Sequence, residues 1–477
     1  MIPLKEKIST EPGFQYVIDN MELMSTSGRQ LMLHQNLFTD AEALLSEYDN
    51  IERMVAVIGD EERKPALDTL RHQFMQLHDL TGTLANISRH SVLDEIELYE
   101  IKNLSHICTI AAKSAAELGI ADILRLPDTK SVFSLLDPDS TNIPHFYIYD
   151  SYHPQLPDIR RQLKALQIHL DTIADDNDEK KEMQLKINDL LDKQNDIQRL
   201  VLEQLSEKLH SHLQLLTLAH NQMAYGDFLL AKATMAKRWQ LSRPSLSSDG
   251  STRYLSLWNP RLRHRNEELH QRYQPVDIEI HKGTCLVTGA NMAGKTVLLK
   301  SVGIAQLMAQ YGFYVPAEKA QISIVGDVAF CIGDEQNEMN GLSSFASEIT
   351  KISSVLTRAK KERLLILIDE PARTTNPVEG KALVQAVATL LDKESSQTII
   401  TTHYSQLGLS CRRLRVKGFV ESLSDAIVTP ANINSFIDYS LLPDNSDEVP
   451  HEALRIASIM QCDKEMLETA EHFLQKE

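Results

Sequence analysis

The stretch that most constrains the fold of this chain runs from Leu286 to Thr296 and reads Leu-Val-Thr-Gly-Ala-Asn-Met-Ala-Gly-Lys-Thr. It fits G-x-x-x-x-G-K-[ST], the pattern of a loop whose backbone N–H groups surround a polyphosphate. Gly289 and Gly294 suit that role because a Cβ would obstruct the close approach of a phosphate. The apolar run 284–287 predicts a buried strand before the loop, and 297–310 carries apolar residues at helical spacing. The stretch therefore predicts an α/β nucleotide-binding domain.

Each residue of this loop is a candidate nucleotide-binding residue: Gly289, Ala290, Asn291, Met292, Ala293, Gly294, Lys295 and Thr296. Lys295 would reach the β- and γ-phosphates as a point charge, while the Thr296 hydroxyl would bind Mg²⁺. The positive end of the following helix adds to this anion site. The alternative is an ordinary glycine-containing turn with a surface lysine, which the motifs further along the chain disfavour.

Two acidic residues follow the apolar run Leu364–Ile368. Parallel strands present their last residues at the carboxyl edge of a sheet, where ligands bind. Asp369 is then placed to hold Mg²⁺, and Glu370 is the candidate catalytic base that orients a water. The alternative is that both acids only end a strand at the surface, which the upstream loop makes less favourable.

Two further segments carry weaker signals. Residues 397–403 predict another strand, and its last residue, His403, is a catalytic candidate that could contact the γ-phosphate or the attacking water. A histidine in such a place is more often structural. Ser343 lies in a Gly-Leu-Ser-Ser-Phe turn before a helical stretch and could bind an anion, although by itself this turn is only a good helix cap.

Composition bounds the classes of protein that this chain can belong to. The 477 residues suggest two or three domains, and 42% hydrophobic with 24% charged residues is typical of a soluble globular protein. No apolar run approaches a membrane span and no secretory signal is recognisable, so we expect no membrane partner. Five widely spaced cysteines predict a reducing, cytoplasmic location. The net charge of −17 disfavours binding to duplex DNA.

The pattern along the chain predicts a multidomain protein, all-α in its first half and α/β afterwards. Residues 1–125 show helical periodicity, including one helix expected over 66–84, and 126–156 form a proline-rich connector in which 146–149 could be a strand. Residues 157–241 predict a long helical arm whose basic and acidic residues alternate. From 242 to 430 strands alternate with helices, and a basic cluster lies near the start of this part: Arg261, Arg263, His264, Arg265 and Arg272.

At this point the chain resembles the MutS ATPases, which are relatives of the ABC ATPases. The resemblance rests on segments in the same order and at similar spacing: 289–296, 315–320, 341–345, 367–373 and 401–404. It is strong over about 280–407 and continues weakly into 453–474. By this resemblance residues 1–125 are a helical core domain, 126–156 a connector, 157–241 a lever arm, 242–430 a P-loop ATPase domain and 431–477 dimerisation helices.

The resemblance implies a homo- or heterodimer that binds ATP and Mg²⁺ through the ATPase domain. Ser343 of one subunit would reach the γ-phosphate bound by Lys295 of the other. ATP would close the dimer, hydrolysis would reopen it, and the cycle would move the helical arms. This chain departs from the family at Pro371-Ala372-Arg373, and we expect the mismatch-recognition and DNA-clamp domains to be missing.

These observations leave two functions open. Short MutS-like proteins of this kind resemble subunits of reactivating factors for cobalamin-dependent aminomutases such as lysine 5,6-aminomutase. The chain would then be an accessory ATPase that remodels a protein client, which its acidity favours. The alternative is a DNA-binding MutS relative in mismatch repair or recombination. A further possibility is that the chain is one half of a heteromeric ATPase.

Overall fold

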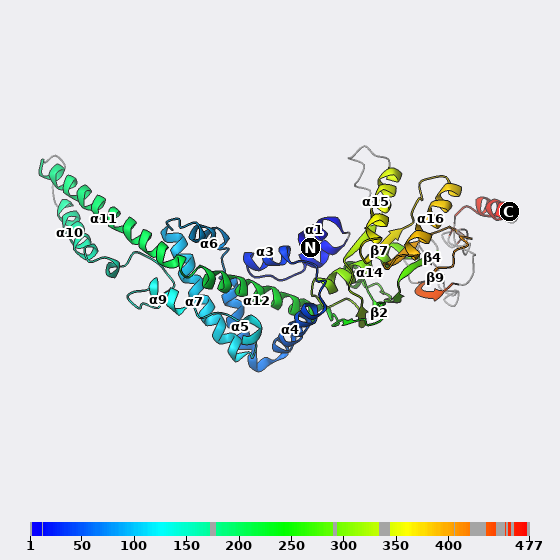
Figure 1. Ribbon diagram of the computed structural model, residues 1–477, viewed down its shortest axis with the longest axis horizontal. Helices are drawn as coiled ribbons and strands as arrows, with labels where there is room; N and C mark the ends of the chain where they lie inside the picture. The colour runs from blue at the N-terminus through cyan, green and yellow to red at the C-terminus, as the bar shows by residue number, and fades with distance from the viewer. Residues whose placement is uncertain are drawn as a thin grey trace. The chain divides into compact units, whose positions relative to one another are not determined.

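The computed structural model describes residues 2–11, 13–171, 178–289, 293–332, 344–404, 406–419, 436–444, 454, 457–458 and 462–474. The chain forms two compact units. The first, here called the sheet unit, contains Met1–Met21, His34–Glu52 and Thr234–Glu477. The second, here called the helical unit, contains Glu22–Leu33 and Arg53–Ala233. The structure confirms the coarse prediction of a helical first half and a mixed α/β second half (Figure 1).

The helical unit is built on long helices, among them α7 (Glu95–Glu117), which buries residues such as Leu104 and Ile107. Asp94 and Glu97 form a reciprocal capping box at its start, which bonds two otherwise unpaired backbone N–H groups. The arm consists of α10 (Leu156–Leu170) and α11 (Asp178–His210), which pack together around Ile159, Leu163 and Ile187. The other helices of this unit are α5 (Lys64–Met75), α6 (Thr81–Ser88), α8 (Ala121–Leu124) and α9 (Lys130–Leu135).

Two sequence-based expectations about this unit were wrong. The single helix expected over 66–84 is divided between α5 and α6, because the Asp79 carboxylate accepts hydrogen bonds from the N–H and hydroxyl of Thr81 and starts a new helix there. Residues 146–149 form no strand. The Lys102 ammonium instead bonds the backbone carbonyl of His145 at 2.9 Å and the Tyr149 hydroxyl at 2.8 Å, so the apolar pattern reflects burial among helices.

Three of the described helices contribute residues to both units, namely α3 (Thr26–His34), α4 (Ala41–Gly59) and α12 (Leu213–Trp239). The sheet unit also contains α1 (Leu4–Thr10) and α2 (Phe14–Asp19). Within the described residues, no helix is both long enough and apolar enough to cross a membrane.

The main sheet of the sheet unit has six strands in the order β10-β9-β4-β8-β7-β6. All neighbouring pairs are parallel except that β10 runs antiparallel to β9. The strands are β4 (Gly283–Thr288), β6 (Asp327–Cys331), β7 (Leu364–Asp369), β8 (Gln397–Thr401), β9 (Arg412–Phe419) and β10 (Ile437–Pro443). The strands predicted over 284–287 and 364–368 are therefore confirmed, and the one predicted over 397–403 is present but ends at Thr401.

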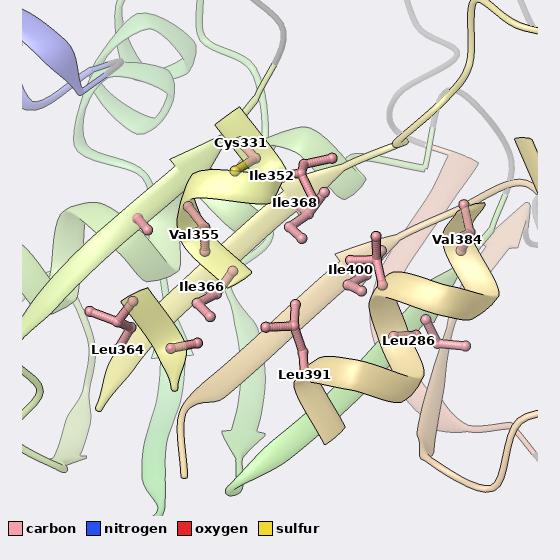
Figure 2. Close-up of a cluster of buried hydrophobic side chains, with 14 of the residues drawn as sticks. Leu286, Cys331, Ile352, Val355, Leu364, Ile366, Ile368, Val384, Leu391 and Ile400 are labelled. Atoms are coloured by element: carbon pink, nitrogen blue, oxygen red, sulfur yellow. The ribbon is translucent and has the colours of Figure 1, made fainter. Parts of the chain in front are cut away.

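Helices cover both faces of this sheet. On one face α15 (Ser344–Ala359) and α16 (Pro377–Asp392) bury Val355 and Leu391 against strand residues such as Ile366 (Figure 2). Because side chains alternate along a strand, Leu367 points to the opposite face, where α14 (Lys295–Gln310) lies. Gly303 of α14 permits this approach, since a Cβ there would be 2.8 Å from Leu367 Cδ1. The predicted helix over 297–310 is thus confirmed.

A smaller sheet has the order β1-β5-β2-β3. Its strands are β1 (Ser245–Leu246), β2 (Thr252–Leu257), β3 (Val276–Ile280) and β5 (Lys319–Ile322), with α13 (Pro260–Glu268) between β2 and β3. The described part of the C-terminal region also includes α18 (Lys464–Leu474).

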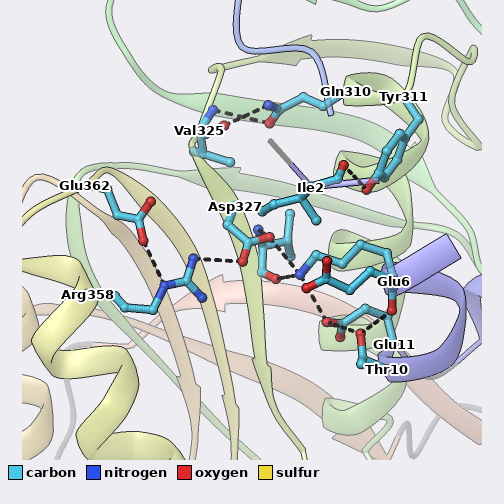
Figure 3. Close-up of polar contacts among 12 residues, drawn as sticks. Ile2, Glu6, Thr10, Glu11, Gln310, Tyr311, Val325, Asp327, Arg358 and Glu362 are labelled. Atoms are coloured by element: carbon cyan, nitrogen blue, oxygen red, sulfur yellow. Dashed lines mark hydrogen bonds and ion pairs between the residues drawn. The ribbon is translucent and has the colours of Figure 1, made fainter. Parts of the chain in front are cut away.

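A buried ion network joins three parts of the sheet unit (Figure 3). Asp327, the first residue of β6, accepts from Lys7 of α1 at 2.7 Å and from Arg358 of α15 at 2.8 Å. Lys7 also donates to the backbone carbonyl of Val328 at 2.9 Å. Because buried charges are stable only when they are paired and hydrogen-bonded, this network fixes α1 against the edge of the main sheet.

Candidate functional site

The candidate phosphate-binding loop connects β4 to α14, so the strand and the helix expected on either side of it are present. Gly289 has φ 147°, and Gly294 adopts the left-handed region with φ 73° directly before the helix. A Cβ on Gly289 would lie 3.3 Å from the Cβ atoms of Ala293 and Val416, and one on Gly294 would lie 3.0 Å from Tyr439 Cδ1. Both positions therefore need glycine for space as well as for backbone conformation. Ala290, Asn291 and Met292 lie outside the described residues.

Lys295 is the buried cation of the site. Its side chain is 3% exposed, and its ammonium donates to the Gly289 carbonyl at 2.6 Å and lies 3.1 Å from Glu370 Oε1. Glu370 is itself 14% exposed. A buried ammonium requires a compensating anion, and in this structure the candidate catalytic carboxylate supplies it.

The two candidate metal ligands contact each other directly. The Thr296 hydroxyl donates to Asp369 Oδ2 at 2.7 Å, and the Thr401 hydroxyl donates to Asp369 Oδ1 at 2.6 Å. Hydroxyl and carboxylate oxygens are the ligands that Mg²⁺ prefers, and this ion usually completes its shell with water and substrate phosphates. The described residues contain no group of three or more His, Cys, Asp or Glu side chains that could hold a metal alone. The donor set therefore fits Mg²⁺ bound together with a phosphate.

Glu370 lies at the end of β7 with its backbone fixed by β8. Its N–H donates to the Thr401 carbonyl at 3.2 Å and to the Thr401 hydroxyl at 3.0 Å. His403 Nδ1 lies 3.9 Å from Glu370 Oε2, which is close enough for an electrostatic interaction but too far for a hydrogen bond. The structure thus brings Lys295, Thr296, Asp369, Glu370 and His403 to one edge of the sheet, whereas Ser343 lies outside the described residues.

The order of the strands explains why these residues meet. β8 lies between β4 and β7, and Thr401 is in register with Val287 on one side and with Asp369 on the other. All three strands are parallel, so their carboxyl ends share one edge. Sequence reasoning missed the role of Thr401, because the predicted strand extended past it, whereas β8 ends at this residue.

A pocket of about 540 Å³ lies beside the loop. Residues from distant parts of the sheet unit line it, among them Tyr273, Gln274, Gly294, Val297, Val416 and Tyr439. The Gln274 NH2 group donates to Asp438 Oδ1 at 2.8 Å and to the Ser440 hydroxyl at 3.3 Å, and its carbonyl accepts from the N–H of Tyr439 at 3.3 Å. Burial raises the pKa of the Tyr439 hydroxyl. Apart from Gly294, these lining residues were not predicted from the sequence, because Tyr273 and Gln274, Val416 and Tyr439 lie in separate segments.

Part of the sheet unit is similar in sequence to known proteins. Residues 285–476 match the family model described as MutS domain V. Over 238 residues the chain is 38% identical to the Endonuclease MutS2 of Caldanaerobacter subterraneus, a match that covers 49% of this chain and 28% of that protein. The Endonuclease MutS2 of Lactobacillus helveticus is 35% identical over 214 residues, or 44% of this chain and 26% of the relative. These matches thus cover about a quarter of the length of the relatives and less than half of this chain.

The loop geometry predicts a difference between two glycine substitutions. Gly294→Ala and Gly408→Ala both place alanine at positive φ, but the Gly408 Cβ would have no atom within 4 Å. We expect Gly408→Ala to lower the free energy of unfolding by about 1 kcal/mol through backbone strain alone. Gly294→Ala should lower it by about 2–3 kcal/mol, because the methyl group also meets the Tyr439 ring. Urea-induced unfolding measures both, and equal losses would contradict the close packing at Gly294.

Proposed function

We propose that this chain is a MutS-family, Mg²⁺-dependent ATPase whose nucleotide cycle drives a conformational change. The observation that carries the proposal is the grouping of a buried Lys295–Glu370 pair with the Thr296–Asp369 contact at one edge of a parallel sheet. Four residues from two separate sequence motifs contact each other in the combination that phosphoryl-transfer chemistry needs. The match to MutS domain V covers the same residues.

In this proposal the bound nucleotide replaces contacts that the site residues make with one another. The phosphates would take the Lys295 ammonium from Glu370, and the freed carboxylate would orient the attacking water as a base. Thr296 and Asp369 would hold Mg²⁺, which neutralises charge on the β- and γ-oxygens when it is bound. His403, 38% exposed beside Glu370, would contact the γ-phosphate or the water.

We place the base of the nucleotide in the pocket beside Gly294. The pocket adjoins the loop, so a base there would be continuous with phosphates bound along 289–296. Tyr273 and Tyr439 supply aromatic surface, and the Gln274 carbonyl, whose amide is held by Asp438, Ser440 and Tyr439, has a second lone pair that can accept a hydrogen bond. These groups suit a flat heterocycle with polar edges.

We further propose that the site is completed by a second subunit, either a copy of this chain or a related one. Ser343 of that subunit would contact the γ-phosphate, so that ATP closes the dimer and hydrolysis opens it. The helical arm of α10 and α11 would move with this cycle. All five cysteines are unpaired, which suits a cytoplasmic protein.

The client of this motion is, in our proposal, a protein. Lysines of the arm are paired with acids on the same helix, as with Lys186–Glu182 at 2.8 Å and Lys193–Asp189 at 2.6 Å. Such a helix offers little net positive charge to DNA phosphates. Reactivation of a cobalamin-dependent aminomutase is one role of this kind. The alternative, a DNA-binding role, draws support from the relatives, which carry the name endonuclease.

The ATPase proposal predicts separate effects on binding and turnover. Glu370→Gln keeps the shape of the side chain but removes the base, so turnover should fall by at least about a hundredfold while ATP still binds. Glu379→Gln, an exposed glutamate in the first turn of α16, is the matched control and should behave as wild type. Phosphate release and calorimetric titration with ATP measure the two quantities. Unchanged turnover in Glu370→Gln would remove Glu370 from the role of base.

The protein-client proposal predicts weak interaction with DNA. The purified chain is titrated with duplex, mismatched and branched DNA over a salt series, with ATP turnover followed in parallel. We expect no binding at low salt and no stimulation of turnover. Binding that weakens steeply with salt and stimulates turnover would instead establish the DNA-binding role.

A further inference from the structure

The turn after β7 holds two non-glycine residues in the left-handed backbone region. Glu370 has φ 41° and Ala372 has φ 61°, with Pro371 between them. Residues other than glycine rarely adopt this region and keep it only where the surrounding structure fixes them. The conformation of the turn therefore depends on groups outside it.

Two side chains from outside the turn bond both polar backbone groups of Ala372. Its N–H donates to Glu348 Oε1 of α15 at 3.2 Å, and its carbonyl accepts from the Tyr404 hydroxyl at 3.2 Å. The carbonyl also accepts a longer bond from the Thr375 N–H at 3.4 Å. Ala372 is completely buried, so neither group can turn to bulk water instead.

Gly380 of α16 makes room for the tyrosine. A Cβ at this position would lie 2.2 Å from the Tyr404 hydroxyl and 3.0 Å from the Ala372 carbonyl oxygen. Any other residue at 380 would displace the hydroxyl from its acceptor. Three separate segments, namely α15, α16 and the residues after β8, thus converge on the backbone of Ala372.

The other end of the turn carries the candidate catalytic carboxylate. The Glu370 N–H is fixed by Thr401, and the proline ring at 371 limits φ of the residue between the two left-handed positions. A shift of Ala372 would therefore be transmitted through one restrained residue to Glu370. Glu348 and Tyr404 do not bond Lys295, Thr296 or Asp369 in the described contacts.

We propose that Glu348 and Tyr404 are positioning residues for hydrolysis, which hold the turn so that the Glu370 carboxylate faces the phosphate site. This inference rests on the proposed function, in which Glu370 orients the attacking water. Because the bonds to Ala372 act on Glu370 through the turn, losing either bond should lower turnover and leave ATP binding intact. The Tyr404 ring also lies against His403, with ring centroids 4.4 Å apart, and a change that removes only the hydroxyl keeps this contact. A role only in folding would instead lower stability and affect binding and turnover together.

The first test compares two substitutions of Glu348 in the full chain. Glu348→Ala leaves the Ala372 N–H without its acceptor, and should lower kcat at saturating Mg·ATP about tenfold or more with Kd for ATP within about twofold. Glu348→Gln keeps an acceptor oxygen and should hold kcat within about threefold of wild type. Thr350→Ala is the matched control, since the exposed Thr350 hydroxyl bonds only the Ala346 carbonyl of its own helix.

The second test removes only the tyrosine hydroxyl and covers the case in which Glu348→Ala fails to fold. Tyr404→Phe should lower kcat by about fivefold or more, again with Kd for ATP within about twofold. Tyr152→Phe is the matched control, because its hydroxyl donates to the Leu135 carbonyl at 3.0 Å within the helical unit. That variant should keep the kcat of wild type.

The outcomes separate this inference from the proposed function. If the wild-type chain hydrolyses ATP and both Glu348→Ala and Tyr404→Phe keep its kcat, the positioning role is overturned and the ATPase proposal stands. Equal losses in Glu348→Ala and Glu348→Gln, or losses of binding that match those of turnover, would also overturn it. If the wild-type chain binds ATP but does not hydrolyse it, both the proposed ATPase function and this inference are contradicted.

Discussion

The placement of β8 between β4 and β7 is the constraint on which the rest of the site depends. Because the three strands are parallel, the phosphate-binding loop, Asp369 and Glu370 reach the same edge of the sheet. Thr401, at the end of the middle strand, then bonds the Asp369 carboxylate with its hydroxyl and the Glu370 N–H with its carbonyl. The buried apolar strands provide the stability for this arrangement, since α15 and α16 pack on one face of the sheet and α14 packs on β7 and β8 from the other. The burial of these strands therefore determines where the candidate site residues lie at the edge of the sheet.

The polar side chains at this edge bond one another, and in our proposal a bound nucleotide would replace these bonds. Lys295 is paired with Glu370, and the Thr296 hydroxyl is bonded to Asp369. A buried ammonium without a partner would be strongly unfavourable, so the pair keeps the site stable before nucleotide binds. Phosphates carry more negative charge than one carboxylate and suit the same ammonium. In this account binding and activation are coupled, because the event that engages Lys295 also frees Glu370 for its role with water.

The sequence predicted the strands, the helix after the loop and most residues of the site, because glycines, buried runs and terminal acids have local signals. The pocket was not predictable, since Tyr273 and Tyr439 belong to segments that only the sheet topology brings together. The left-handed turn at Glu370 and Ala372 was also missed, because neither residue is the glycine that usually marks such a conformation. The split between α5 and α6 depended on one side chain, Asp79, that competes with the helix. Long-range contacts and single hydrogen bonds therefore account for what local patterns left out.

We propose that ATP is hydrolysed at this edge of the sheet, with Mg²⁺ held by Thr296, Asp369 and the phosphates. The most direct measurement is phosphate release from ATP by the purified wild-type chain, with Mg²⁺ present and with Mg²⁺ removed by a chelator. We predict steady release that requires Mg²⁺ and returns when the ion is restored. Release at the same rate in the presence of the chelator, or no release under either condition, would contradict the account.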